Sequence, residues 1–263
     1  MAAVPDKNVY CVAVQNTDFD TCQSIVKTLF SDVEFNAKHR LGAVNSINWA
    51  RIVAQIVYYF QAYFLLPADK RGKIQFVVPT GNFGDILAGF YAKRLGLPMG
   101  PLTVATNEND ILERFFKTGR YEQEDKSAAK AEASKQSPET AVVNGSSDGQ
   151  QATSAHSAVK STHSPAMDIL LSSNFERLLY YLADDVADHS SASESVERRT
   201  AGQKTLKGWM DGMKKDGGVD MGEKVRDVAS NEFWAERVSD EQVGTVIRVL
   251  SFGIPSLNTL QIC

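Results

Sequence analysis

The stretch Lys73–Gly96, KIQFVVPTGNFGDILAGFYAKRLG, decides the fold that the sequence predicts. Its first part, Ile74–Val78, is a short apolar run rich in branched and aromatic residues, which predicts a strand buried on both faces. Pro79 is expected to end the strand, because proline cannot donate a hydrogen bond to a neighbouring strand. Residues 80–85 (TGNFGD), here called the glycine loop, then lead into a helical pattern.

The glycine loop has the form of a phosphate-binding turn. Its backbone N–H groups converge near a helix N-terminus, where the partial positive charge attracts an anion. The loop matches neither GxGxxG nor GxxxxGKS/T, which disfavours a dinucleotide or a nucleoside triphosphate and leaves a small phosphate ester or a phosphorylated cofactor. The alternative is a turn that needs glycine only for packing.

The composition is that of a globular protein, with 43% hydrophobic and 23% charged residues among 263. A net charge of −4 gives no reason to expect a nucleic-acid partner. The three cysteines and four histidines show no spacing typical of disulfides or metal ligands, so no metal is expected. The sequence has no secretory signal and no apolar run long enough to span a membrane, so we expect a cytoplasmic protein.

A second anion site is indicated at Asn45–Arg51 (NSINWAR), where the densely apolar helix Trp49–Leu66 begins. Asn48 and Arg51 lie three residues apart and therefore on one helix face. A guanidinium, an amide and a hydroxyl beside a helix N-terminus would hold an anion well. In the alternative interpretation Ser46 only caps the helix and Arg51 pairs with a carboxylate. The helix itself is expected to be largely buried, because little of its surface is polar.

Other segments complete an α/β pattern. Strands are expected at 8–14 and 102–105, with a possible strand at 41–44, and Asn107 is expected to cap a helix that runs through Phe116. Strands alternating with helices predict an open parallel sheet. Ligands bind at the carboxyl ends of the strands in such sheets, so the two candidate sites could share one crevice.

The chain divides into four parts by composition. Residues 1–121 form part of an α/β domain, and residues 122–165, rich in Ser, Ala, Lys and Glu, read as a disordered insert. Residues 166–249 are expected to be mainly helical, including the apolar segment 232–238, and residues 250–263 are an atypical tail.

Four motifs follow one another along the chain: VNSINWAR (44–51), VVPTGNFGDILAG (77–89), ATNENDIL (105–112) and SPAMDILLSSNFERLL (164–179). Together they resemble the threonine synthases, in the branch with a long insert. The resemblance implies a pyridoxal-phosphate enzyme of the tryptophan-synthase-β fold type (fold type II), of whose open parallel sheet this chain holds a part. It also implies a lyase that converts the small molecule O-phospho-L-homoserine and water to L-threonine and phosphate in threonine biosynthesis.

The resemblance assigns roles to two groups of residues. Those implied at the phosphate of the pyridoxal 5'-phosphate cofactor are Thr80, Gly81, Asn82, Phe83, Gly84 and Asp85. Those implied at the substrate phosphate are Asn45, Ser46, Asn48 and Arg51. Backbone N–H groups are expected to bind the cofactor phosphate, while Asp85 caps its helix because a carboxylate repels an anion. Arg51 suits the substrate phosphate, since its planar guanidinium can bind phosphate through two hydrogen bonds.

The chain also departs from the family it resembles. The family's Schiff-base lysine lies in a phenylalanine-lysine-aspartate context, which this sequence lacks, and its closing threonine-alanine-histidine-proline segment is missing too. We therefore expect a chain truncated at both ends, without a catalytic residue and inactive alone. The alternatives are a non-catalytic protein that binds phosphate ligands and another pyridoxal-phosphate lyase of the same fold type. The sequence does not predict an oligomeric state.

Overall fold

The computed structural model describes residues 6–15, 17, 19–122, 159–187 and 195–253. The chain divides into two compact units, Met1–Asn45 and Ser46–Cys263.

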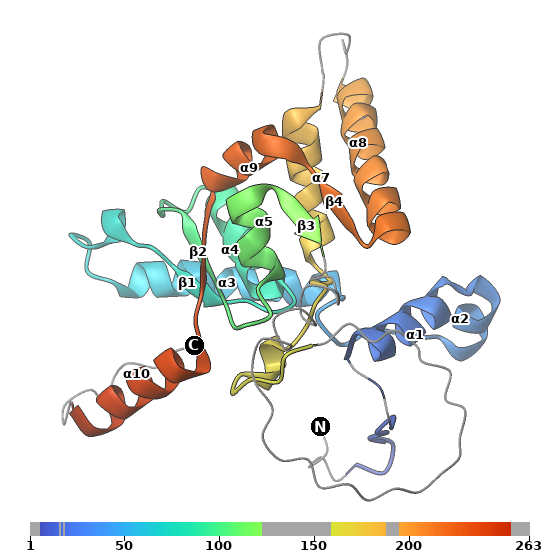
Figure 1. The fold of residues 1–263 in the computed structure, drawn as a ribbon, viewed down its shortest axis with the longest axis horizontal. Helices are drawn as coiled ribbons and strands as arrows, with labels where there is room; N and C mark the ends of the chain where they lie inside the picture. The colour runs from blue at the N-terminus through green and yellow to red at the C-terminus, as the bar shows by residue number, and fades with distance from the viewer. Residues whose placement is uncertain (1–5, 16, 18, 123–158, 188–194, 254–263) are drawn as a thin grey trace, which may run out of the picture. The chain divides into compact units, whose positions relative to one another are not determined.

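The first unit contains two helices, α1 (Phe19–Ser31) and α2 (Val33–His39) (Figure 1). Asp32 caps α2, since its carboxylate accepts a backbone N–H of the first turn at 2.9 Å. The expected strand at 8–14 is wrong, and the possible strand at 41–44 is not formed either. An apolar run becomes a strand only beside a partner strand, and the described residues of this unit contain none.

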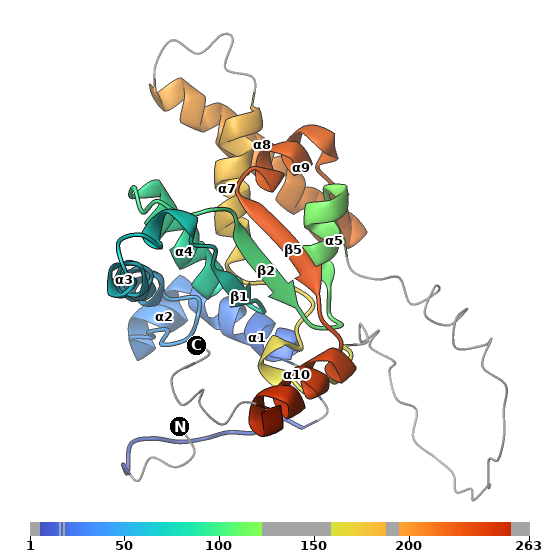
Figure 2. The ribbon, with the colours of Figure 1, turned by 90° about the vertical axis from the view of Figure 1, so that its left-hand side faces the viewer.

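The second unit is built on a parallel sheet of three strands in the order β1-β2-β5 (Figure 2). The strands are β1 (Val77–Pro79), β2 (Leu102–Thr106) and β5 (Phe233–Arg237). β2 lies in the middle, where Val104 is opposite Val78 of β1 and Ala235 of β5. The open parallel sheet expected from the sequence is therefore confirmed, and its strands present their carboxyl ends at one edge.

Strand β1 differs from its prediction because it is an edge strand of the described sheet. It spans three residues in place of the expected Ile74–Val78, and the side chain of Val77 is 64% exposed. Pro79 is the last residue of β1, so the strand ends at the proline that was expected to end it. An edge position permits this proline, because its missing N–H has no ladder partner to lose.

Strand β5 corrects the expectation of a helical segment at 232–238. Its burial alternates, with Phe233 and Ala235 buried while Trp234 between them is exposed. A period of two is that of a strand, and pairing with β2 fixes it. The third strand of the sheet therefore comes from the part of the chain that follows the insert.

Three helices lie around the sheet and the glycine loop. Helix α3 (Trp49–Leu65) packs against α4 (Gly84–Arg94), which connects β1 to β2. Helix α5 (Ile111–Thr118) follows β2 and packs against β5. Asp110 is the N-cap residue of α5 and makes no capping hydrogen bond with its side chain, so the expected cap by Asn107 is wrong.

Helix α3 is less buried than its composition predicts. Ile52, Tyr59 and Tyr63 are buried, whereas Val53 and Val57 are 45% and 64% exposed. Helix α4 covers one side of α3, and no described element of the same unit covers the other. The expectation of a largely buried helix is therefore wrong for this chain.

The remaining elements complete the second unit. They are η1 (Arg71–Lys73), β3 (Arg120–Glu122), η2 (Pro165–Met167), α7 (Phe175–Val186), α8 (Ser195–Asp216), β4 (Gly218–Asp220), α9 (Gly222–Ser230) and α10 (Asp240–Gly253). Strands β3 and β4 pair antiparallel, and α7 packs against both α8 and α9 (Figure 1).

A cluster of aromatic side chains forms the centre of the core. The rings of Phe83, Phe116, Phe175 and Phe233 are buried and contact one another, with the Phe83 and Phe175 centroids 5.1 Å apart. Each ring comes from a different part of the chain: the glycine loop, α5, α7 and β5. Burial of rings of this size fixes the glycine loop to the core.

Two predicted segments fall wholly or partly outside the described residues: the insert at 122–165, apart from residues 122 and 159–165, and the tail at 250–263 beyond Gly253. No helix in the described part of the chain is long and apolar enough to cross a membrane. Among the same residues no group of histidine, cysteine and acidic side chains could hold a metal ion.

Candidate functional site

The glycine loop leaves the sheet at the carboxyl end of β1. The N–H of Thr80 donates to the carbonyl of Ala105 on β2 at 2.8 Å, and the Thr80 hydroxyl donates to the carbonyl of Val78 at 2.7 Å. Thr80 is buried, so these bonds fix the point where the loop begins. The loop therefore lies at the edge of the sheet that sequence reasoning selected.

Phe83 has an unusual backbone conformation at the N-cap of α4. Its φ of 61° and ψ of 11° lie in the left-handed region, which a residue other than glycine adopts rarely. The side chain is 1% exposed and packed among core rings, which stabilises this conformation. Phe83 can therefore reach a ligand only through its backbone.

Six successive backbone N–H groups, from Gly81 to Ile86, donate no hydrogen bond to another described residue. Three of them, at Gly81, Asn82 and Phe83, precede α4, and three belong to its first turn, where intrahelical acceptors are lacking. A left-handed residue directly before a helix brings such groups into one concave arrangement that attracts anions. This arrangement fits the backbone-mediated phosphate site expected from the sequence.

The carbonyl groups of the glycine loop are bound by the segment of residues 159–174, here called the clamp segment. The Ser172 hydroxyl donates to the Gly81 carbonyl at 2.5 Å. The Asn174 backbone N–H and side-chain Nδ2 donate to the Asn82 carbonyl at 3.1 and 3.0 Å. A Cβ on Gly81 would lie 3.1 Å from the carbonyl oxygen of Ala166, so glycine allows this close approach.

The clamp segment is itself anchored beside the ends of β2 and β5. The carboxylate of Asp168 accepts hydrogen bonds from the side chains of Asn107, Asn109 and Thr162 at 2.7, 3.2 and 2.7 Å. Asn107 and Asn109 are buried, and each anchors the clamp segment through its amide. The carboxylate of Asp240, which follows β5, accepts the N–H of His163.

The N-terminus of α3 is capped by Asn48, whose side-chain oxygen accepts the N–H of Ala50 at 2.9 Å. This corrects the alternative in which Ser46 is the cap. Arg177 of α7 fixes the same turn, because its guanidinium donates to the carbonyl of Ile47 at 2.7 Å and lies 5.5 Å from the ring centroid of Trp49.

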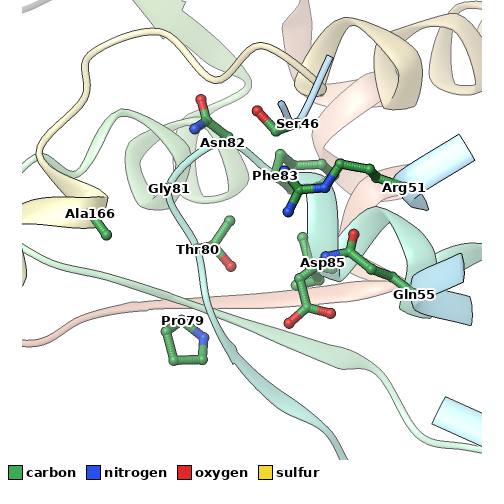
Figure 3. Close-up of a pocket in the computed structure, with 12 residues that line it drawn as sticks. Ser46, Arg51, Gln55, Pro79, Thr80, Gly81, Asn82, Phe83, Asp85 and Ala166 are labelled. Atoms are coloured by element: carbon green, nitrogen blue, oxygen red, sulfur yellow. The ribbon is translucent and has the colours of Figure 1, made fainter. Parts of the chain in front are cut away.

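The glycine loop and the start of α3 meet in one pocket of about 370 Å³ (Figure 3). Its lining residues are Ser46, Arg51, Gln55, Pro79, Thr80, Gly81, Asn82, Phe83, Gly84, Asp85, Ile86 and Ala166. The structure thus brings Ser46 and Arg51 to the predicted cofactor residues. Asn48 is not among the lining residues, and Asn45 is the last residue of the first unit.

Asp85 lies in the first turn of α4 and is not its N-cap, contrary to the expected capping role. Its carboxylate accepts hydrogen bonds from the hydroxyls of Tyr58 and Tyr59, both on α3. Burial raises the pKa of the Tyr59 hydroxyl above its usual value, and the adjacent Asp85 charge raises it further. The hydroxyls of Tyr58 and Tyr59 therefore stabilise the negative charge of the Asp85 carboxylate.

Sequence reasoning did not assign Gln55, Ala166 or Tyr59 to the site or its support. Gln55 follows Arg51 by four residues and lies on the same face of α3, so helical spacing could have found it. Tyr59 follows Gln55 by four more residues and shares this spacing, and it reaches Asp85 because α3 packs against α4. Ala166 carries no local signal and lines the pocket only because the clamp segment passes Gly81.

Comparison with known proteins gives no match to a family model. Curated relatives are nevertheless similar over most of this chain. Threonine synthase of Schizosaccharomyces pombe is 48% identical over 253 residues, which are 94% of this chain and 43% of the relative. Threonine synthase of Saccharomyces cerevisiae is 45% identical, over 94% of this chain and 41% of the relative.

The solved structures that are similar to this chain are also threonine synthases. A crystal structure of threonine synthase from yeast matches with a TM-score of 0.68 at 44% identity, covering 94% of this chain and 40% of that one. A threonine synthase from Brucella melitensis with bound pyridoxal phosphate matches with a TM-score of 0.63 at 38% identity, covering 90% and 41%. The chain spans about two fifths of the length of the relatives it matches.

Proposed function

Because the chain is a homologue of the threonine synthases, corresponding to about two fifths of their length, we propose that it forms the phosphate-binding part of such an enzyme. The reaction would convert O-phospho-L-homoserine and water to L-threonine and inorganic phosphate. One observation carries the proposal: a single pocket is lined by both the glycine loop and the Arg51 side chain. A phosphorylated cofactor and a phosphorylated substrate require two such phosphate-binding groups close together.

The glycine loop is proposed to bind the phosphate of pyridoxal 5'-phosphate. The N–H groups from Gly81 to Asp85 lack protein acceptors among the described residues, and Gly81 permits the close approach of the clamp segment. When bound, this cofactor supplies an electron sink for carbanions formed on an amino acid. The residues assigned to this task are Thr80, Gly81, Asn82, Phe83, Gly84 and Asp85.

Within that group the contributions differ. Phe83 contributes its N–H, because its side chain belongs to the core. Asp85 supports the loop through Tyr58 and Tyr59, which keep the carboxylate hydrogen-bonded on the α3 side of the pocket. These hydrogen bonds keep the Asp85 carboxylate away from the proposed phosphate, whose negative charge would repel it.

The substrate phosphate is proposed to bind to Arg51 and Ser46. The Arg51 guanidinium is the positive side chain of the pocket lining and can form two parallel hydrogen bonds with a phosphate. Asn48 is proposed to contribute by capping α3, the helix that carries Arg51 in its first turn. Asn45, which precedes Ser46, is proposed as a further donor.

The alternative functions are less well supported. Another lyase of this fold type would act on an unphosphorylated amino acid and would need no Arg51 beside the cofactor site. A non-catalytic binding protein would retain the pocket, but the similar relatives are named threonine synthases. We assign the chain a small-molecule substrate in the cytoplasm, with no nucleic-acid or membrane partner.

The proposal is tested by titrating the 263-residue chain, with pyridoxal 5'-phosphate present, with O-phospho-L-homoserine and with L-homoserine. The phosphorylated compound is expected to bind at least tenfold more tightly, since charge-assisted hydrogen bonds to its phosphate are lost in the other. Equal affinity would contradict the proposal. We also expect no phosphate release from this chain alone, because its sequence contains no phenylalanine-lysine-aspartate motif; clear turnover would refute that expectation.

A further inference from the structure

We propose that Ser172 and Asn174 are positioning residues of the glycine loop. By holding two loop carbonyls on one side, they direct the N–H groups of the same peptides toward a bound phosphate. The inference rests on the proposed function, because it concerns the loop assigned to the cofactor phosphate.

Ser172 and Asn174 contact the carbonyls of two successive peptide groups of the glycine loop. The Gly81 carbonyl accepts the Ser172 hydroxyl at 2.5 Å, and the Asn82 carbonyl accepts two donors of Asn174 at 3.0 and 3.1 Å. A carbonyl oxygen has two lone pairs, so Asn174 satisfies the Asn82 carbonyl completely. Both carbonyls are thereby fixed against the clamp segment.

Because the peptide group is planar, fixing a carbonyl also fixes the N–H group of the same peptide. The described residues contain no cis peptide bond, and in a trans peptide the N–H points opposite to the C=O. Fixing the carbonyls of Gly81 and Asn82 therefore fixes the N–H groups of Asn82 and Phe83 on the other side. These two N–H groups have no acceptor among the described residues, and both residues line the pocket.

The burial of Asn174 favours a specific role. The side chain is 0% exposed, and its Oδ1 has no hydrogen-bond partner in the described part of the chain. A buried amide with one unsatisfied atom is unfavourable for folding, so a hydrophobic residue would serve stability better at this position. The donor Nδ2, which bonds to the Asn82 carbonyl, is the reason that an amide is needed.

Ser172 is equally well placed to act on the loop. It is 7% exposed, and its backbone N–H donates to the hydroxyl of Tyr121 at 3.1 Å. The contacts of Asp168 anchor the chain four residues earlier. The hydroxyl therefore approaches Gly81 from a segment fixed on both sides of the contact.

The test measures the affinities of the chain for pyridoxal 5'-phosphate and for pyridoxal, which lacks the phosphate. Ser172→Ala and Asn174→Ala are each expected to reduce the preference for the phosphorylated compound about tenfold, as loss of a hydrogen bond that orients the phosphate site. A purely structural effect would weaken both compounds equally and leave the preference unchanged. Circular dichroism establishes that each variant is folded.

Ser230→Ala is the matched control. The Ser230 hydroxyl also donates to a backbone carbonyl at 2.5 Å, that of Arg226 in α9, and its loss should leave the preference unchanged. If the unchanged chain itself shows no preference, the proposed cofactor site is wrong and the inference falls with it. If the unchanged chain shows the preference and both folded variants retain it, the positioning role alone is overturned. If one variant does not fold, the other decides the question by the same measurement.

Discussion

The Tyr59 hydroxyl lies 3.0 Å from Oδ1 of Asp85 and 3.1 Å from the backbone oxygen of the same residue. The contact joins α3, which carries Arg51, to the first turn of α4, which continues the glycine loop. The two proposed phosphate sites are thus joined by a buried tyrosine that neither site uses directly.

The first prediction concerns the alkaline stability of this contact. The folded-state pKa of Tyr59 is raised above the usual value of 10, first by burial and then by Asp85. Below pH 10 both states keep the proton and the contribution to stability is complete. Above it the unfolded chain loses the proton that the folded chain retains, so stability falls by about 1.4 kcal/mol per pH unit for each such group.

Tyr59→Phe should therefore reduce this slope by one proton, as measured by urea denaturation between pH 10 and 12. Tyr91 retains a contribution of its own, because burial raises its pKa too. Tyr10→Phe, at a position 83% exposed, is the control and should keep the original slope. An unchanged slope in Tyr59→Phe would show that the hydroxyl is not protected in the folded state.

The second prediction concerns the packing of Gly89 against the Tyr59 ring. A Cβ on Gly89 would lie only 2.7 to 3.0 Å from three atoms of the Tyr59 side chain. Gly89→Ala should displace the ring and destabilise the fold by about 1–3 kcal/mol in chemical denaturation. Gly208→Ala is the matched substitution, since nothing lies within 4 Å of its Cβ in α8. It should stabilise the fold by up to about 1 kcal/mol, through higher helix propensity. The same sign for both would contradict the packing described for α3 and α4.

The third prediction separates the two phosphate sites. Arg51→Ala should weaken O-phospho-L-homoserine binding by about ten- to a hundredfold, because a charge-assisted hydrogen bond contributes about 1.5–3 kcal/mol. Pyridoxal 5'-phosphate binding should change less than about threefold. Arg199→Ala, at an exposed arginine of α8, should alter neither affinity. An equal loss for both ligands would count against separate roles for Arg51 and the glycine loop.

The fourth prediction concerns the exposed side of α3. Val53 and Val57 lie one turn apart on α3 and are both exposed, and such apolar surface favours self-association. The chain is expected to associate with increasing concentration in sedimentation velocity. The double variant Val53→Lys, Val57→Lys should reduce association, whereas Gln203→Lys on exposed α8 should not. A monomeric chain at all concentrations would refute this expectation.

Local pattern was sufficient to predict the glycine loop and its two neighbours. An apolar run before Thr80 and a helical period after Asp85 indicate a strand, a loop and a helix, and the loop was correctly placed at a strand end. The juxtaposition of Arg51 with this loop was also foreseen, because both lie at helix N-termini next to the same sheet edge.

Long-range pairing was not predictable in the same way. Strand β5 follows β2 by more than a hundred residues, and its short alternating pattern becomes decisive only beside β2. The contacts of Ser172 and Asn174 with the loop carbonyls depend on tertiary packing, which no local spacing encodes. The composition of α3 tells which of its residues prefer burial and not which elements of this chain cover them.

The central claim is that the glycine loop binds the phosphate of the cofactor through backbone N–H groups. Its most direct test is a calorimetric titration of the chain with pyridoxal 5'-phosphate and with pyridoxal, combined with amide NMR spectra of the glycine loop. We expect one binding site, at least tenfold tighter for the phosphorylated compound, with shifts at the amides of Asn82, Phe83 and Gly84. Equal affinities, or tight binding that leaves these three amides unshifted, would contradict it.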